Sequence, residues 1–100
     1  MKKAFKLFSQ HRDGIGPLFI NRRLRIPLGV WLPAEDHPTK GYAHRPGWHV
    51  TSGPHAPHLS PVGRVWYRVE VRDFVTLQRP ASQGGTWYLA KQMRVLGVAP

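Results

Sequence analysis

The sequence predicts a mainly β fold, either a small twisted antiparallel sheet or a partly open barrel. Three observations favour it. No long amphipathic helical pattern occurs, apolar and polar residues alternate with a period of two in several segments, and turn signals rich in Gly and Pro separate those segments. A chain of 100 residues, 41% of them hydrophobic, has room for one core, so residues 1–100 are expected to form a single domain.

The N-terminal part predicts a β-hairpin. Lys3 to Phe8 is short and rich in apolar residues, which is typical of a strand. Asp13-Gly14 is a strong turn signal because Gly tolerates positive φ and the Asp side chain can bond to its own backbone. Leu18-Phe19-Ile20 is then expected to be the second strand of the hairpin.

A third strand is predicted from Leu24 onward, where the alternation is clear. One side carries Leu24, Ile26, Leu28, Val30 and Leu32, and the other carries Arg25, Pro27, Gly29 and Trp31. This period of two is typical of a half-buried strand. Because Pro27 has no N–H to donate, the strand is expected at a sheet edge or bent there.

Residues 33–63 are expected to form a long, irregular but ordered loop inserted between strands. The loop holds six prolines and five histidines: Pro33, Pro38, Pro46, Pro54, Pro57 and Pro61, with His37, His44, His49, His55 and His58. Loops of this length are usually functional or disordered, and the apolar residues within this one favour packing. We expect a short strand at 47–50, with Trp48 packed onto the sheet and His49 pointing the opposite way.

The strongest strand pattern runs from Arg64 to Leu77. Val65, Tyr67, Val69 and Val71 share one face, and Asp73 marks a bend. Residues 79–85 have the composition of a turn, and Thr86 to Leu89 restarts a strand. Residues 90–96 could place Leu89, Met93 and Leu96 on a helix face, but the preceding Trp-Tyr and the following Gly97 favour a strand.

The charge balance points toward a polyanionic partner. The chain carries 15 Lys and Arg against 5 Asp and Glu, a formal net charge of +10, and ten of the cations are Arg. Arg presents a planar fork that suits phosphate and stacks on bases, so an Arg excess with four Trp favours nucleic-acid contact. The alternative is a solvated surface, or a compositional bias toward Arg, Pro and Gly.

Composition excludes several classes of protein. The absence of Cys rules out disulfide scaffolds and thiol catalysis. No apolar run approaches the roughly 20 residues that a membrane-spanning helix needs, and the N-terminal stretch lacks the apolar region of a signal peptide. We therefore expect a cytoplasmic protein with no membrane contact. Phosphate-binding glycine motifs and a nucleophile elbow are absent from the sequence as well.

A stripe of Arg and Trp provides the candidate nucleic-acid surface. Residues two apart on a strand share a face, so Arg64, Trp66, Arg68, Glu70 and Arg72 are expected to form a row about 26 Å long. Such a row offers charge for a backbone and a π-face for bases. The alternative places Trp66 in the core. The full candidate set is Arg22, Arg23, Arg25, Arg64, Trp66, Arg68 and Arg72.

An enzyme is the second hypothesis. Its candidate catalytic residues are His49, His55, His58, Arg45 and Glu70, since His with Arg can perform acid–base work beside a developing negative charge. The alternative is that the histidines are structural hydrogen-bonding groups and that Glu70 forms a cross-strand ion pair. Zinc spacing relies on Cys or on helix-borne His pairs, and neither is present, so no metal and no cofactor is predicted.

Several short motifs of the sequence resemble those of a known group of domains. Arg45-Pro46-Gly47-Trp48-His49, Pro54-His55-Ala56-Pro57-His58-Leu59, Arg64-Val65-Trp66 and Val69-Glu70-Val71 resemble uncharacterised domains encoded by bacteriophages and mobile elements. The likeness extends to residues 16–20, 31–35 and 85–89, nearly the whole chain. It implies a phage- or element-type protein but no particular activity. A weaker likeness, to small phage domains similar to the split sheet of ADP-ribosyltransferases, implies an ADP-ribose-type substrate for the enzyme hypothesis.

Three functional hypotheses follow from the sequence. The first is a small basic accessory protein that binds nucleic acid or a nucleoprotein complex through its Arg and Trp surface. The second is a compact enzyme based on His and Arg that acts on a nucleotide, RNA or an ADP-ribose-type substrate. The third is an inhibitor-type protein whose basic surface binds an acidic host protein. The sequence favours the first.

Overall fold

The computed structural model describes residues 1–17, 24–34, 47–60 and 62–99, and it is mainly β. The elements in chain order are β1 (Lys2–His11), β2 (Gly14–Gly16), β3 (Trp31–Pro33), β4 (Trp48–Thr51), β5 (Arg64–Gln78), the 3₁₀ turn η1 (Ala81–Gln83) and β6 (Thr86–Val98). The strands form a single antiparallel sheet, which confirms the predicted fold class. No helix in these described residues is long and apolar enough to cross a membrane.

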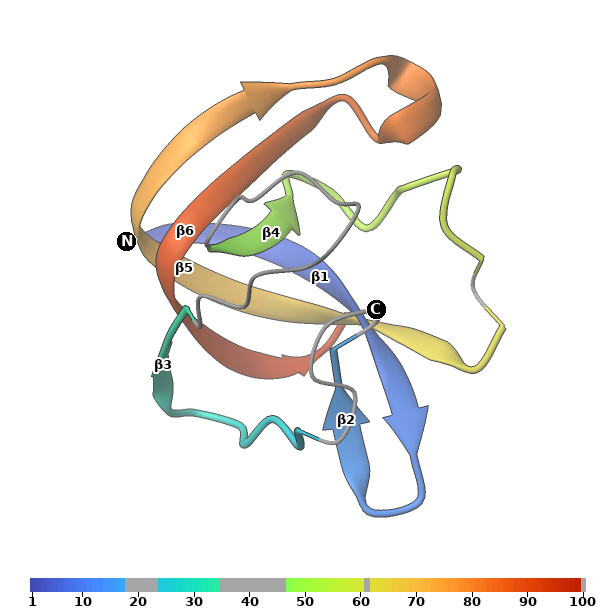
Figure 1. Ribbon diagram of the computed structural model, residues 1–100, viewed down its shortest axis with the longest axis vertical. Coiled ribbons are helices and arrows are strands. Elements are labelled where there is room, and N and C mark those ends of the chain that lie inside the picture. The colour runs from blue at the N-terminus through green and yellow to red at the C-terminus, as the bar shows by residue number, and fades with distance from the viewer. Residues whose placement is uncertain (18–23, 35–46, 61, 100) are drawn as a thin grey trace, which may run out of the picture.

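The strand pairings close into a ring, as Figure 1 shows. β5 pairs with β1 along one edge and with β6 along the other. β6 also pairs with β3 and β4, and β4 returns to β1 where Phe5 lies opposite Thr51. β2 pairs with the far end of β1 and projects from the ring as a short hairpin (Figure 1).

The two longest strands of the sheet are β5 and β6. The predicted strand at 64–77 is confirmed, and Asp73 has a φ of 55°, so the predicted bend is present. Residues 86–98 form one continuous strand, which confirms the strand interpretation of 90–96. The register shifts between Arg68, which lies opposite Gly97, and Val69, which lies opposite Val95, so Leu96 is the extra residue of a β-bulge.

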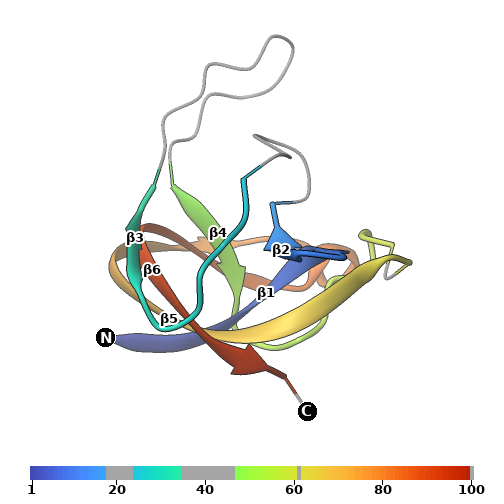
Figure 2. The same cartoon turned by 90° about the horizontal axis from the view of Figure 1, so that it is seen from below.

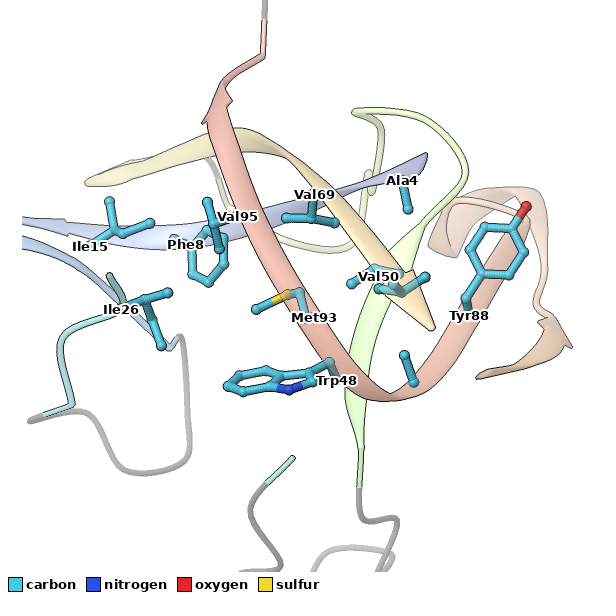
Figure 3. Packing of buried hydrophobic residues seen from close by; sticks show 12 residues of the cluster. Ala4, Phe8, Ile15, Ile26, Trp48, Val50, Val69, Tyr88, Met93 and Val95 are labelled. Atoms are coloured by element: carbon cyan, nitrogen blue, oxygen red, sulfur yellow. The ribbon is translucent and has the colours of Figure 1, made fainter. Parts of the chain in front are cut away.

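The core lies inside the ring, between β1, β4, β5 and β6. Figure 3 shows its side chains pointing toward one another from these strands, and the largest fully buried ones are Phe8, Val50, Val69, Val71, Met93 and Val95. Trp48 joins this core with only 9% of its surface exposed, and its indole Nε1 donates to the carbonyl of Leu32 at 3.0 Å. The prediction that Trp48 packs onto the sheet is therefore confirmed.

One prediction of local structure was wrong. The alternation from Leu24 to Leu32 does not form one strand, because Gly29 adopts a φ of 76° and strand geometry begins only at Trp31. Leu28 and Val30 are half exposed as a result, and Ile26 alone of the predicted apolar side is fully buried. The hairpin partner of β1 is Gly14–Gly16, whereas Leu18-Phe19-Ile20 lies outside the described residues.

Candidate nucleic-acid interface

The outer face of the ring carries one row of side chains that crosses four strands. Residues directly opposite each other in an antiparallel pair share a face. Lys3 of β1 lies opposite Glu70 of β5, Glu70 lies opposite Arg94 of β6, and Arg94 lies opposite Trp31 of β3. Figure 2 shows β3 beside β6 along this part of the sheet. Residues from both ends and the middle of the chain therefore meet on one surface.

Trp31 is the centre of a cation–π cluster. The guanidinium carbon of Arg72 lies 4.1 Å from the centroid of the Trp31 ring, and that of Arg94 lies 5.0 Å from it. Arg72 Nε also donates to Gln92 Oε1 at 2.7 Å, so the guanidinium is held by a ring on one strand and an amide on another. A guanidinium held in this way loses less conformational entropy when it binds a ligand.

Glu70 and Arg94 form the cross-strand ion pair of this row. Arg94 Nη2 lies 2.5 Å from Glu70 Oε1, and the Glu70 side chain is only 12% exposed. Arg94 Nε is buried and has no hydrogen-bond partner among the described residues. Glu70 therefore orients Arg94 beside Trp31, and this is the cross-strand ion pair that the sequence analysis gave as the alternative to a catalytic Glu70.

Arg68 extends the cation row along β5. Its side chain is exposed, and its Nη2 lies 3.4 Å from the position that a Cβ would occupy on Gly97. The Arg68 guanidinium therefore lies against β6 near Gly97. Arg68, Leu96, Lys3 and Phe5 line a hollow of about 100 Å³.

The remaining residues of the predicted surface are distributed differently. Arg64 donates to the carbonyl of Ser60 at 3.1 Å, and Trp66 is half buried on the outer face opposite Leu7. Arg25 pairs with Asp13 at 2.7 Å on the β1–β2 hairpin, and the Arg25 guanidinium lowers the Asp13 carboxyl pKa. Arg22 and Arg23 lie outside the described residues.

Sequence reasoning missed three residues of the cluster, namely Lys3, Trp31 and Arg94. The sequence pattern places Lys3 in a basic N-terminal strand, Arg94 in a C-terminal strand and Trp31 on the polar side of a longer strand, without bringing them together. The pairing of β3 with β6, which are about 60 residues apart in the chain, brings Trp31 to Arg94. No local pattern in the sequence reports such a pairing.

The candidate catalytic residues do not share one site in the described part of the chain. His49 lies on β4, and His55 and His58 are exposed in the loop that follows it. The His58 ring lies 5.9 Å from that of Trp87, whereas Glu70 binds Arg94. Trp87 and Arg94 are seven residues apart on β6, roughly 23 Å along an extended strand. Arg45 lies outside the described residues.

Lys6 points to the other side of the sheet. Lys6 lies opposite Tyr67 in the register, on the face that also carries Ala4 and Phe8. Its Nζ donates to the carbonyl of His49 at 2.8 Å and so bridges β1 and β4 beyond their single paired position. Burial lowers the pKa of the Lys6 amine to about 8. Lys6 is thus a cation of the interior, separate from the outer row.

Groups of three or more His, Asp or Glu side chains that could hold a metal ion do not occur within the described ranges. Comparisons with known protein families, with curated proteins and with solved structures found no match. The geometry of the outer face therefore carries the functional argument.

Proposed function

We propose that this protein binds nucleic acid, alone or within a nucleoprotein complex, through the outer face that carries Trp31, Arg68, Arg72 and Arg94. The observation that carries the proposal is the stacked arrangement of Arg72 and Arg94 on Trp31, with Arg72 anchored to Gln92. A cytoplasmic accessory role fits this activity, as the sequence analysis expects.

The positive charge and the planar groups of the outer face complement the phosphates and the flat bases that all nucleic acids share. Among the described residues, eleven Lys and Arg stand against three Asp and Glu. Of those acids, Glu70 is engaged by Arg94 and Asp13 by Arg25. Exposed guanidinium groups bind phosphates through charge-assisted hydrogen bonds and stack on unpaired bases. Stacking of a base on an aromatic side chain such as Trp31 would contribute about 1–3 kcal/mol.

A binding function is favoured over the enzyme alternative by the same geometry. Acid–base catalysis needs its groups within hydrogen-bond reach of one substrate. The exposed histidines of the 52–60 loop and the carboxylate of Glu70 occupy different parts of the sheet. Arg72, Arg94 and Trp31, in contrast, converge on a single surface.

A salt-dependent binding titration tests the proposal. Fluorescence anisotropy of labelled single-stranded RNA and DNA, measured between 50 and 300 mM salt (roughly the range in which counterion release is resolved), should give affinities that fall steeply with salt. Arg68→Gln and Arg72→Gln should each weaken binding and lower the salt slope by about 0.7 for each lost phosphate contact.

Arg12→Gln is the matched control, because it removes the same charge from an exposed turn between β1 and β2. It should leave the slope unchanged. If the wild-type protein shows no affinity at low salt, or if Arg12→Gln weakens binding as much as the two outer-face variants, the proposed interface is wrong.

A further inference from the structure

The second half of β5 is a sheet edge that the ring leaves unpaired. β1 pairs with β5 only from Arg64 to Val71, whereas β6 pairs with it as far as Gln78. Within the described chain, residues 72–78 therefore have a neighbouring strand on one side only. Half of the backbone groups of such a segment face outward and can accept another strand.

Residues 74–78 of this edge lack the usual protection against strand addition. Phe74-Val75-Thr76-Leu77-Gln78 carries no charge and no proline and is rich in residues that favour strands. Residues 72–76 are all exposed, with 58% of the Val75 surface in solvent. Phe74 is held at the edge by Tyr88, since their rings meet edge to face at a centroid distance of 5.4 Å.

The charged side chains near residues 74–78 indicate what the edge binds: cations lie at both ends, and the exposed Asp73 just before Phe74 is the one acidic residue of the described part of β5 beyond Glu70. At one end, Lys2 lies opposite Val71, and its ammonium lies 5.5 Å from the centroid of the Tyr88 ring. At the other end Arg79 follows the strand, and its guanidinium carbon lies 5.7 Å from the centroid of the Trp87 ring. An occupant with carboxylates near both ends of a short strand would complement these cations.

A second copy of this chain fits the edge less well. Each copy carries a net charge of +10, so pairing of two β5 edges brings two strongly positive molecules together. Each would also add its own Lys2 and Arg79 to the cations already at the edge. An acidic extended segment of another protein adds the opposite charge and gains the same backbone hydrogen bonds.

We propose that residues 74–78 of β5 form a docking edge for an acidic, extended peptide segment of a partner protein, which adds to the sheet as a further strand. This activity is independent of nucleic-acid binding, since it uses a strand edge and its backbone groups. The alternating side chains of the peptide lie over Val75 and Phe74, and its carboxylates lie near Lys2 and Arg79.

The test uses a blocked hexapeptide of alternating glutamate and valine as the probe. We expect it to bind the full chain and to slow hydrogen exchange in the fragment containing residues 72–79. A hexapeptide of alternating lysine and valine should not bind. The glutamate peptide with N-methyl groups on alternate residues should not bind either, because it cannot form the ladder hydrogen bonds.

Val75→Glu places a repelling charge on the edge and should weaken peptide binding at least tenfold. Val62→Glu is the matched control, because Val62 is 83% exposed and precedes β5, away from the edge. The proposal is overturned by absence of binding, by equal losses in both variants, by undiminished binding of the N-methylated peptide, or by protection confined to other residues. A dimer that sedimentation detects and Val75→Glu dissolves would overturn it too, because the occupant would be a second copy.

Discussion

At the scale of single residues, Trp48 holds its part of the chain against the sheet. Its indole is buried in the core while Nε1 bonds to the carbonyl of Leu32, so one side chain joins β4 to the strand that carries Trp31. His49 follows it on β4, is half buried and faces the other way. Neighbouring residues of one strand thus have different roles.

Trp48→Ala should lower the free energy of unfolding by about 3–5 kcal/mol, because the truncation leaves a cavity and removes the bond to Leu32. His49→Ala, the neighbouring control, should cost about 1 kcal/mol or less. Urea denaturation of both variants measures the difference. A larger loss for His49→Ala would mean that His49 is the anchor.

The buried amine of Lys6 makes stability depend on pH. Its pKa falls from 10.5 to about 8 on folding, so between these values the unfolded chain binds more protons than the folded protein. The free energy of unfolding therefore rises with pH in this window, by about 1–2 kcal/mol between roughly pH 7.5 and 9.5. Lys6→Met should lack this rise, whereas Lys91→Met, at an exposed position, should keep it. Equal pH dependence in both variants, measured by urea denaturation, would contradict the account.

At the scale of elements, local patterns predicted those strands that local sequence controls. The alternation in the first half of β5 and the turn residues before β6 were sufficient because Val65, Tyr67, Val69 and Val71 share one face that packs on the core. The alternation from Leu24 to Leu32 predicted a strand that does not form. Gly29 interrupts it in a left-handed conformation and donates its backbone N–H to the carbonyl of Val95, a contact with a distant segment that the local pattern does not contain. Cross-strand neighbours such as Trp31 and Arg94 depend on register between distant segments, which periodicity does not contain.

The turn between β5 and β6 offers an element-scale prediction at Gly84. This residue caps η1 with a φ of 94°, and a Cβ there would lie 2.7 Å from the carbonyl oxygen of His55. Gly84→Ala should therefore cost about 1–3 kcal/mol from backbone strain and from displacement of the 52–60 loop. Gly53→Ala, where a Cβ meets nothing within 4 Å, should cost little. Thermal denaturation of the pair tests the claim, and equal midpoints would refute it.

For the whole molecule, the side-by-side pairing of four strands is what assembles the candidate interface. β1, β5, β6 and β3 each contribute one residue to the row of Lys3, Glu70, Arg94 and Trp31. The excess of Arg was visible in the composition, but the gathering of Arg72 and Arg94 around one indole follows only from the pairing of β5, β6 and β3. The interior, in contrast, holds the apolar core and the amine of Lys6.

The indole N–H signals of the four tryptophans test the central claim most directly. Trp31 lies in the outer cation–π cluster, whereas Nε1 of Trp48 and of Trp87 donate to the carbonyls of Leu32 and Gln83 from buried positions. In an NMR titration of the ¹⁵N-labelled protein with a single-stranded oligonucleotide, the Trp31 signal should shift or broaden most, with a smaller change at Trp66. The Trp48 and Trp87 signals should stay in place. Movement of the Trp48 or Trp87 signal while Trp31 remains unchanged, or no movement of any of the four, would contradict an interface on the outer face of the ring.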